Sequence, residues 1–260
     1  MLLQDKVAVI YGAGGSIGRA VALAFAREGA TLFLTGRHAG NVEAVAAAVR
    51  GAGGTAHVDV VDALDPDAVD AHAASVVTAA GHVDISLNLV TRGDVQGIPL
   101  ADMAVEDLLR PVTTGVTANF VTAKAAARHM TAQGSGVILA LNSGSAHGSP
   151  MMGGTGLADA ATEALIRNLA LELGPAGVRA AGVWVAGIPE TLTVEKLSAV
   201  NANLDAAAVE GILAHLASLR MTKRSPRLSE IADTIAFLAS DRAAGITGTF
   251  VNVTGGMFAS

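Results

Sequence analysis

Short apolar runs alternate with longer segments of helical periodicity along the whole chain. The short runs have the length and β-branched content of buried parallel strands, whereas the longer segments repeat apolar residues every three or four positions. Strands are predicted at residues 7–11, 31–35, 55–59, 83–90, 137–142, 179–185 and 249–253. Helices are predicted at residues 16–28, 42–52, 66–80, 105–131, 158–173 and 229–240. The pattern predicts an α/β fold, a single Rossmann-type doubly wound domain whose seven-stranded parallel sheet carries helices on both faces.

One segment, residues 188–227, interrupts this alternation. It contains two predicted short helices, near residues 194–200 and 206–219, and no predicted strand. Because insertions after the carboxyl ends of strands build binding surfaces, we interpret this segment as a substrate lid. The alternative is an excursion over the surface. No linker, repeat or low-complexity tract divides the chain, so residues 1–260 are predicted to form one domain.

A glycine-rich turn follows the first predicted strand and precedes the first predicted helix. Strand, glycine turn and helix together present free backbone N–H groups at a helix N-terminus, where the helix dipole favours an anion. A Cβ in this turn would hold a pyrophosphate away from the backbone. The candidate phosphate-binding residues are Gly12, Gly14, Gly15, Ser16, Ile17 and Gly18. The alternative is an ordinary turn that binds nothing.

Composition excludes several classes of function. The sequence has no cysteine, which rules out a disulfide, a thiolate nucleophile and cysteine-ligated metal. A formal net charge of −6 without a basic cluster argues against nucleic acid as a partner. No apolar run approaches the ~18 residues of a membrane span, and no His/Asp/Glu cluster has metal-ligand spacing. The first residues run directly into a strand without a signal peptide, so we expect a cytoplasmic protein that acts on a small molecule.

Several motifs carry a resemblance to a known family. The spacing Gly12-x-x-x-Ser16-x-Gly18 is similar to a TGxxxGxG loop, with Tyr11 at the threonine and Ser16 at the middle glycine. Asn88 stands at the first position of an NNAG motif, and residues 237–256 are close to an FLASD…ITG…VDGG ending. On these motifs the chain resembles the short-chain dehydrogenase/reductase family over nearly its whole length. The resemblance implies one NAD(P)-binding domain.

The resemblance also implies where the dinucleotide binds. Arg37 follows the second strand, where an acidic residue would bond a ribose 2′-hydroxyl and an arginine suits a 2′-phosphate, so NADP(H) is favoured over NAD(H). Asp59 and Val60 look like the family's DV step at the adenine. Asn88 and Ile188, the latter in a turn similar to PGxVxT, complete the implied cofactor residues. The alternative is that no nucleotide binds.

The family's catalytic groups align poorly with this chain. Family members use a tyrosine, a lysine four residues later, a serine and an asparagine. The corresponding positions are Thr155, Asp159, Ser143 and Gly115. The single tyrosine of the protein is Tyr11, so the usual tyrosine mechanism is excluded.

Other side chains are expected to border the same cavity. Free histidine changes its charge near neutral pH, so His147 could donate a proton to a carbonyl whose oxygen Ser143 holds. Asn119, one helical turn after Gly115, could replace the lost asparagine. Arg92 could meet an anionic substrate or a surface carboxylate. The candidate catalytic residues are Ser143, His147, Thr155 and Asp159.

Three functions remain open from the sequence. The first is a divergent NADP(H)-dependent oxidoreductase of a carbonyl or alcohol substrate, without the usual Tyr–Lys pair. The second is a non-redox enzyme on the same scaffold, such as a dehydratase, isomerase or cyclase. The third is a non-catalytic regulatory or partner subunit. Alanine-rich segments at 116–127 and 158–170 pair across a two-fold axis in relatives, so a homodimer, a homotetramer or a hetero-oligomer with an active relative is expected.

Overall fold

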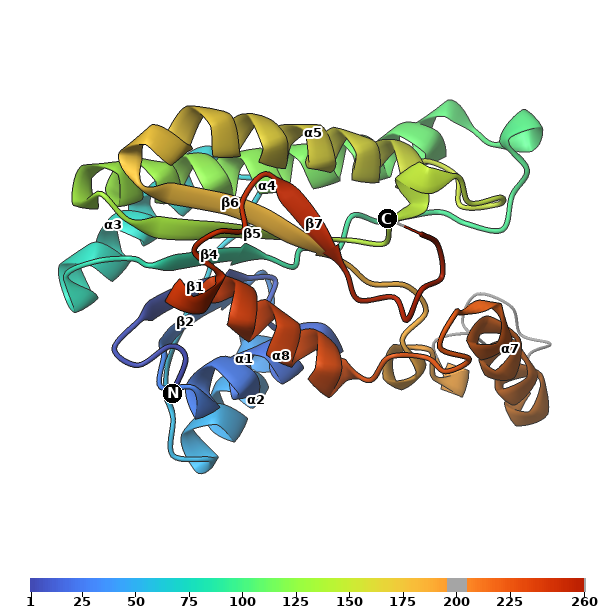
Figure 1. The fold of residues 1–260 in the computed structure, drawn as a ribbon, viewed down its shortest axis with the longest axis horizontal. Coiled ribbons are helices and arrows are strands. Elements are labelled where there is room, and N and C mark those ends of the chain that lie inside the picture. Colours follow the sequence, from blue (N-terminus) through green and yellow to red (C-terminus); the bar gives the residue numbers. More distant parts are fainter. Residues whose placement is uncertain (196–204, 260) are drawn as a thin grey trace.

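Seven parallel strands form one sheet in the order β3-β2-β1-β4-β5-β6-β7. The computed structural model describes residues 1–195 and 205–259 (Figure 1). The strands are β1 Val7–Tyr11, β2 Thr31–Gly36, β3 Thr55–Val60, β4 Ile85–Asn88, β5 Gly136–Asn142, β6 Val178–Trp184 and β7 Thr249–Asn252. Strand order reverses between β1 and β4, which defines the crevice where open α/β sheets bind ligands.

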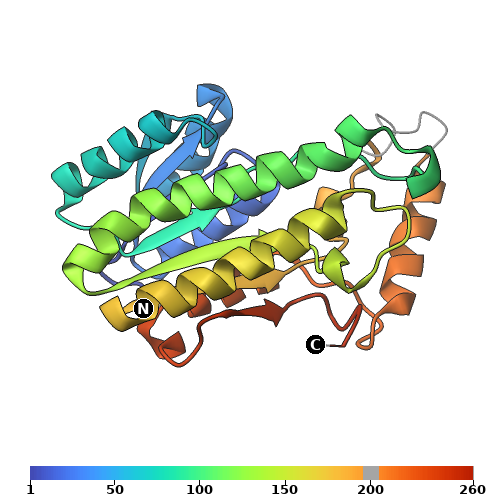
Figure 2. The same ribbon diagram turned by 90° about the horizontal axis from the view of Figure 1, so that it is seen from above.

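Helices cover both faces of the sheet. Helix α1 packs against α2 and α8 on one face, and α4 packs against α3 and α5 on the other. Figure 2 shows α4 and α5 running side by side. The helices are α1 Ser16–Arg27, α2 Ala39–Gly51, α3 Pro66–Ala80, α4 Val105–Gln133, α5 Thr155–Leu173, α7 Ala206–Leu219 and α8 Leu228–Ala239. Figure 1 shows α7 apart from both helical layers.

The core has two layers because successive side chains of a strand point to opposite faces. In β1, Ala8 and Ile10 pack toward α1 and α8, whereas Val7, Val9 and Tyr11 belong to the second cluster. All of β1 is buried, as expected for a central parallel strand. The apolar run that predicted this strand therefore supplies both cores at once.

The predicted α/β fold is confirmed, with differences at element ends. Helices α3 and α7 have the predicted bounds, whereas α5 begins at Thr155 rather than at residue 158. Gly153 and Gly154 immediately precede this start, and Gly153 has a φ of +52° that ends the preceding turn. The earlier start places Thr155 in the first turn of α5. The helix predicted near residues 194–200 lies largely outside the described residues.

Candidate functional site

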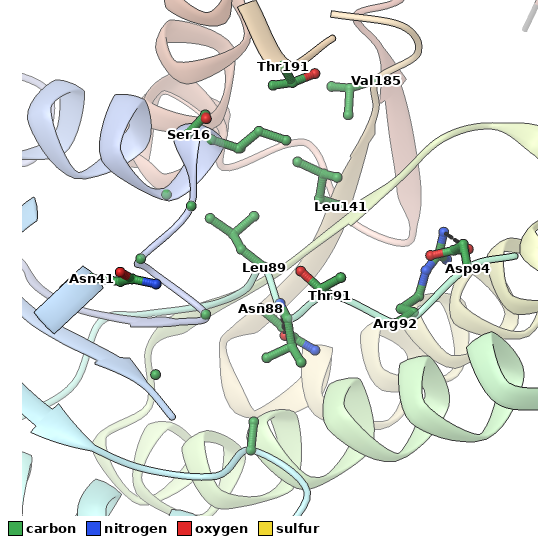
Figure 3. A pocket seen from close by; sticks show the side chains of 18 of the residues that line it. Ser16, Asn41, Asn88, Leu89, Thr91, Arg92, Asp94, Leu141, Val185 and Thr191 are labelled. Atoms are coloured by element: carbon green, nitrogen blue, oxygen red, sulfur yellow. Dashed lines mark hydrogen bonds and ion pairs between the residues drawn. The ribbon is translucent and has the colours of Figure 1, made fainter. Parts of the chain in front are cut away.

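A cavity of about 630 Å³ opens at the carboxyl ends of the central strands. Its wall combines the turn after β1, the residues after β2 and β3, the end of β4 with the loop that follows, the end of β5, one side of α4, and the segment after β6. Figure 3 shows Ser16, Asn88 and Thr191 from three of these segments around the same space. The cavity lies at the reversal of strand order, as the fold predicts.

The glycine turn leaves an open helix N-terminus in this cavity. Gly12 has a φ of +74°, and a Cβ there would lie 2.8 Å from the backbone of Leu89. A Cβ on Gly18 would lie 2.3 Å from the carbonyl oxygen of Ala13. At Gly15, the N-cap of α1, no atom lies within 4 Å of a Cβ position, and no side chain caps the helix. Because the first turn of α1 also lacks an acidic residue, it fits a pyrophosphate.

The residues after β2 and β3 form the next part of the wall. Arg37, His38 and Asn41 line the cavity after β2. His38 and Asn41 were not predicted from the sequence, although both lie within the short segment that joins β2 to the first turn of α2.

Asp59 and Val60 do not line the cavity as expected from the resemblance. The Oδ2 of Asp59 lies 3.5 Å from the Nε2 of His72 on α3. Because β3 continues to Val60, the wall begins one residue later and includes Asp62. Asp62, rather than Asp59, is therefore the acidic residue after β3 that lines the cavity.

Asn88 and Ile188, which the resemblance assigns to cofactor binding, both line the cavity. The Oδ1 of Asn88 accepts a hydrogen bond of 2.9 Å from the backbone N–H of Val90, which shapes the loop after β4. Arg220, which no sequence motif indicated, holds the segment beside Ile188 in place. Its guanidinium donates to the carbonyl oxygens of Ala186, at 2.6 Å, and of Gly187, at 3.0 Å. Burial lowers the pKa of Arg220, and these carbonyl contacts compensate its buried charge.

Asp159 lies at the centre of a buried hydrogen-bond network. Its side chain is fully buried, and Oδ1 accepts a bond of 2.7 Å from Arg92 Nη1. Oδ2 accepts from the Ser143 hydroxyl at 2.6 Å and from the backbone N–H groups of Ser143 and Ser145. The carboxylate is thus surrounded by donors of the protein itself.

Thr155 contacts a second carboxylate. Its hydroxyl donates to Asp94 Oδ1 at 2.9 Å and accepts a bond of 3.3 Å from the Gln96 amide. Arg92 Nη2 lies 3.2 Å from the same Asp94 oxygen (Figure 3). Arg92, Asp94 and Gln96 line the cavity, whereas Thr155 and Asp159 lie behind them. Asp94 and Gln96 were not predicted from the sequence because they belong to an irregular loop without a recognisable pattern.

The absence of a side chain at Gly115 makes room for Arg92. A Cβ on Gly115 would lie 2.6 Å from Arg92 Cδ. Asn119 lines the cavity one turn later, and its amide donates to the Gly115 carbonyl oxygen at 2.8 Å.

His147 is separate from this network. Its ring stacks on Phe258 and meets Trp184 edge-on, each with a centroid distance of 4.7 Å. His147 is exposed and does not line the cavity. The structure therefore brings Ser143, Thr155 and Asp159 together and leaves His147 outside.

Metal-binding groups and membrane-spanning helices are absent from the described residues. Within 1–195 and 205–259, no group of three His, Asp or Glu side chains could hold a metal ion. None of the helices in the described part of the chain is long and apolar enough to cross a membrane.

Comparisons with known proteins agree with the geometry. A family model described as enoyl-(acyl carrier protein) reductase matches residues 12–258. L-Rhamnose 1-dehydrogenase (NAD(P)(+)) of Azotobacter vinelandii is 35% identical over 271 residues, covering 99% of this chain and 98% of the relative. The uncharacterized short-chain type dehydrogenase/reductase y4mP of Sinorhizobium fredii is 31% identical, covering 99% of each chain. The crystal structure of NAD⁺-bound xylitol dehydrogenase matches with a TM-score of 0.87 and 28% identity, covering 98% of this chain and 100% of that one.

The fold and these relatives define a class of oxidoreductases that act on alcohol or carbonyl groups. The chain belongs to the short-chain dehydrogenase/reductase family. The resemblance drawn from the sequence motifs is thereby confirmed for the family and for the fold.

Proposed function

We propose that this protein is an NADP(H)-dependent oxidoreductase that interconverts an alcohol and a carbonyl group without the family's tyrosine and lysine. The uncapped N-terminus of α1 carries the proposal, because open space at Gly15 admits a pyrophosphate to the backbone. Gly12, Gly14, Ser16, Ile17 and Gly18 would hold the same group. When bound, the nicotinamide supplies the hydride chemistry.

The preference for NADP(H) is supported by Arg37. This side chain is exposed and lines the cavity directly after β2. No acidic residue occurs between Gly36 and Val42 to accept a bond from a ribose 2′-hydroxyl. A guanidinium at this position suits a 2′-phosphate through charge-assisted hydrogen bonds.

Asp94 is our candidate for proton exchange with the substrate. It lines the cavity, and 20% of its side chain is exposed. The Asp159 carboxylate is fully buried among donors, and His147 lies outside the cavity. Thr155 and Arg92 orient the Asp94 carboxylate, so a substrate hydroxyl or carbonyl in the cavity would meet it rather than the groups behind it.

Calorimetry with NADP⁺ and NAD⁺ tests the cofactor assignment. We expect NADP⁺ to bind more tightly than NAD⁺. Arg37→Glu should raise the dissociation constant of NADP⁺ by ~10-fold or more, which corresponds to a loss of at least ~1.4 kcal/mol of binding free energy. Arg50→Glu, on the exposed last turn of α2, is the control for charge reversal. Failure of both dinucleotides to bind the wild type would contradict the proposal.

A second experiment tests the proton-exchanging group. Secondary alcohols are screened with the bound nucleotide by the absorbance of reduced nicotinamide. Asp94→Asn should leave nucleotide affinity unchanged and lower turnover by ~10²–10⁴-fold, the usual value of a positioned acid or base. Full turnover by this variant would assign proton exchange to another group.

A non-catalytic, nucleotide-binding partner subunit is the second candidate function. It is favoured by one observation: Ser143, Thr155 and Asp159 are hydrogen-bonded within the protein. Co-purification with a tyrosine-containing relative, together with nucleotide binding and no turnover, would support this function.

A further inference from the structure

We propose that the substrate end of the cavity selects neutral, hydroxyl-bearing substrates and rejects anionic ones. The substrate end is defined here by Arg92, Asp94, Gln96, Asn119 and Ser143, which line the cavity after β4 and β5 and on α4. The inference rests on the proposed function for the reaction and adds the class of molecule on which it acts.

The charge at this end is the first argument. Arg92 faces two carboxylates, with Nη1 2.7 Å from Asp159 and Nη2 3.2 Å from Asp94. One guanidinium against two carboxylates leaves a formal charge of −1. Among the described residues, Arg110 is a second cation near this loop: its Cδ would lie 3.1 Å from a Cβ on Gly93, and its guanidinium pairs with Asp107 at 2.8 Å. A substrate carboxylate or phosphate would therefore enter a negative site.

The burial of the ion pair is the second argument. The Arg92 side chain is 14% exposed and that of Asp159 is fully buried. An anionic substrate could recruit Arg92 only by separating it from one of its carboxylates, and removing the partner of a buried charge is strongly unfavourable. The expectation that Arg92 meets an anionic substrate is thus replaced by an internal role: Arg92 is a positioning residue for Asp94.

The remaining wall suits hydroxyl groups. Gln96 and Asn119 contribute amides, and Thr191 contributes a hydroxyl on the opposite side (Figure 3). Amides and hydroxyls donate and accept, and the Asp94 carboxylate accepts. Gln96 already donates one hydrogen bond to Thr155, and Asn119 donates one to the Gly115 carbonyl oxygen. Each amide keeps its oxygen and a second N–H, which a neutral substrate with several hydroxyl groups would satisfy and an apolar substrate would not.

The experiment compares two probes with the same carbon chain, xylitol and xylonate, which differ in one carboxylate. Their dissociation constants are measured by ligand-observed NMR on the full chain, with and without NADP⁺. We expect wild type to prefer xylitol by at least ~10-fold. Asp94→Asn, which neutralises the formal charge, should narrow this ratio by ~10-fold or reverse it. Glu172→Gln removes the same charge at the far end of α5 and should leave the ratio unchanged.

Each outcome has a defined meaning. Xylonate binding as tightly as xylitol to the wild type, an unchanged ratio in Asp94→Asn, or no binding of xylitol would overturn the selection of neutral substrates. If NADP⁺ does not bind while the probe ratio behaves as expected, the proposed redox function fails and the charge selection stands.

Discussion

Arg92 Nη1 and Asp159 Oδ1 lie 2.7 Å apart and join the loop after β4 to the second turn of α5. The two residues are far apart in sequence. Arg92 lies in the cavity wall, and Asp159 lies behind it. The pair therefore contributes both to the shape of the site and to the stability of the fold. Its contribution can be measured as a change in the free energy of unfolding.

Replacing one partner of this ion pair should destabilise the protein more than replacing both partners. Arg92→Met is expected to lower the free energy of unfolding by ~3–5 kcal/mol, because Asp159 keeps a buried charge with fewer donors. Adding Asp159→Asn should restore part of this loss. Urea denaturation of both single variants and the double variant gives the coupling energy. Effects that add to within ~0.5 kcal/mol would show that the two residues are independent.

Gly115 should not tolerate a side chain. Gly115→Ala places a Cβ 2.6 Å from Arg92 Cδ, and the Arg92 side chain is held at its far end by two carboxylates. We expect a loss of ~1–3 kcal/mol in unfolding free energy, as for other overpacked sites. Gly211→Ala on α7, where a Cβ meets nothing within 4 Å, is the matched control and should stabilise by ~0.5–1 kcal/mol. Equal effects of the two substitutions would contradict the role of Gly115.

Substitutions at Gly15 and Gly18 should have different effects: one should weaken nucleotide binding, and the other should destabilise the fold. Gly15→Asp introduces a charge into open space at the N-cap of α1, so the protein should fold with nearly unchanged thermal stability and lose NADP⁺ affinity by ~10-fold or more. Gly18→Ala, by contrast, puts a Cβ 2.3 Å from the Ala13 carbonyl oxygen and should destabilise the fold. Calorimetry and thermal unfolding of both variants check this pair. Unchanged NADP⁺ affinity in Gly15→Asp would place the nucleotide elsewhere.

Acidification should destabilise the protein partly through His72. Burial lowers the pKa of this histidine below 6.5, and the nearby Asp59 carboxylate opposes the shift only in part. Since the unfolded chain binds the proton at a higher pH than the folded protein does, the stabilising contribution is present above pH 6.5 and is lost as the pH falls below it. The slope reaches at most ~1.4 kcal/mol per pH unit for one group.

Urea denaturation between pH 7 and pH 5 measures this slope. His72→Phe, which keeps a ring edge-on to Tyr11, should flatten it, whereas the exposed His215→Gln should not. An identical slope in His72→Phe and the wild type would assign the acid sensitivity to other groups.

The sequence alone determined the strands, the glycine turn and the family, because local periodicity and short motifs encode them. The assignment of Thr155 and Asp159 to the family's tyrosine and lysine positions comes from the motif alignment and stays a prediction. The tertiary structure decided their partners. Asp94 and Arg92 come from an irregular loop, and their meeting with α5 depends on how α4 and α5 pack and on the space left at Gly115.

The same distinction explains Asp59 and His147. Asp59 was expected in the cavity from a motif, but the strand extends beyond it and its carboxylate lies against α3. His147 was expected beside Ser143 from proximity in sequence, but its ring packs against Trp184 and Phe258, residues more than 35 positions away. Local sequence determines which chemical groups a loop carries. Packing between distant segments determines which of them face the cavity.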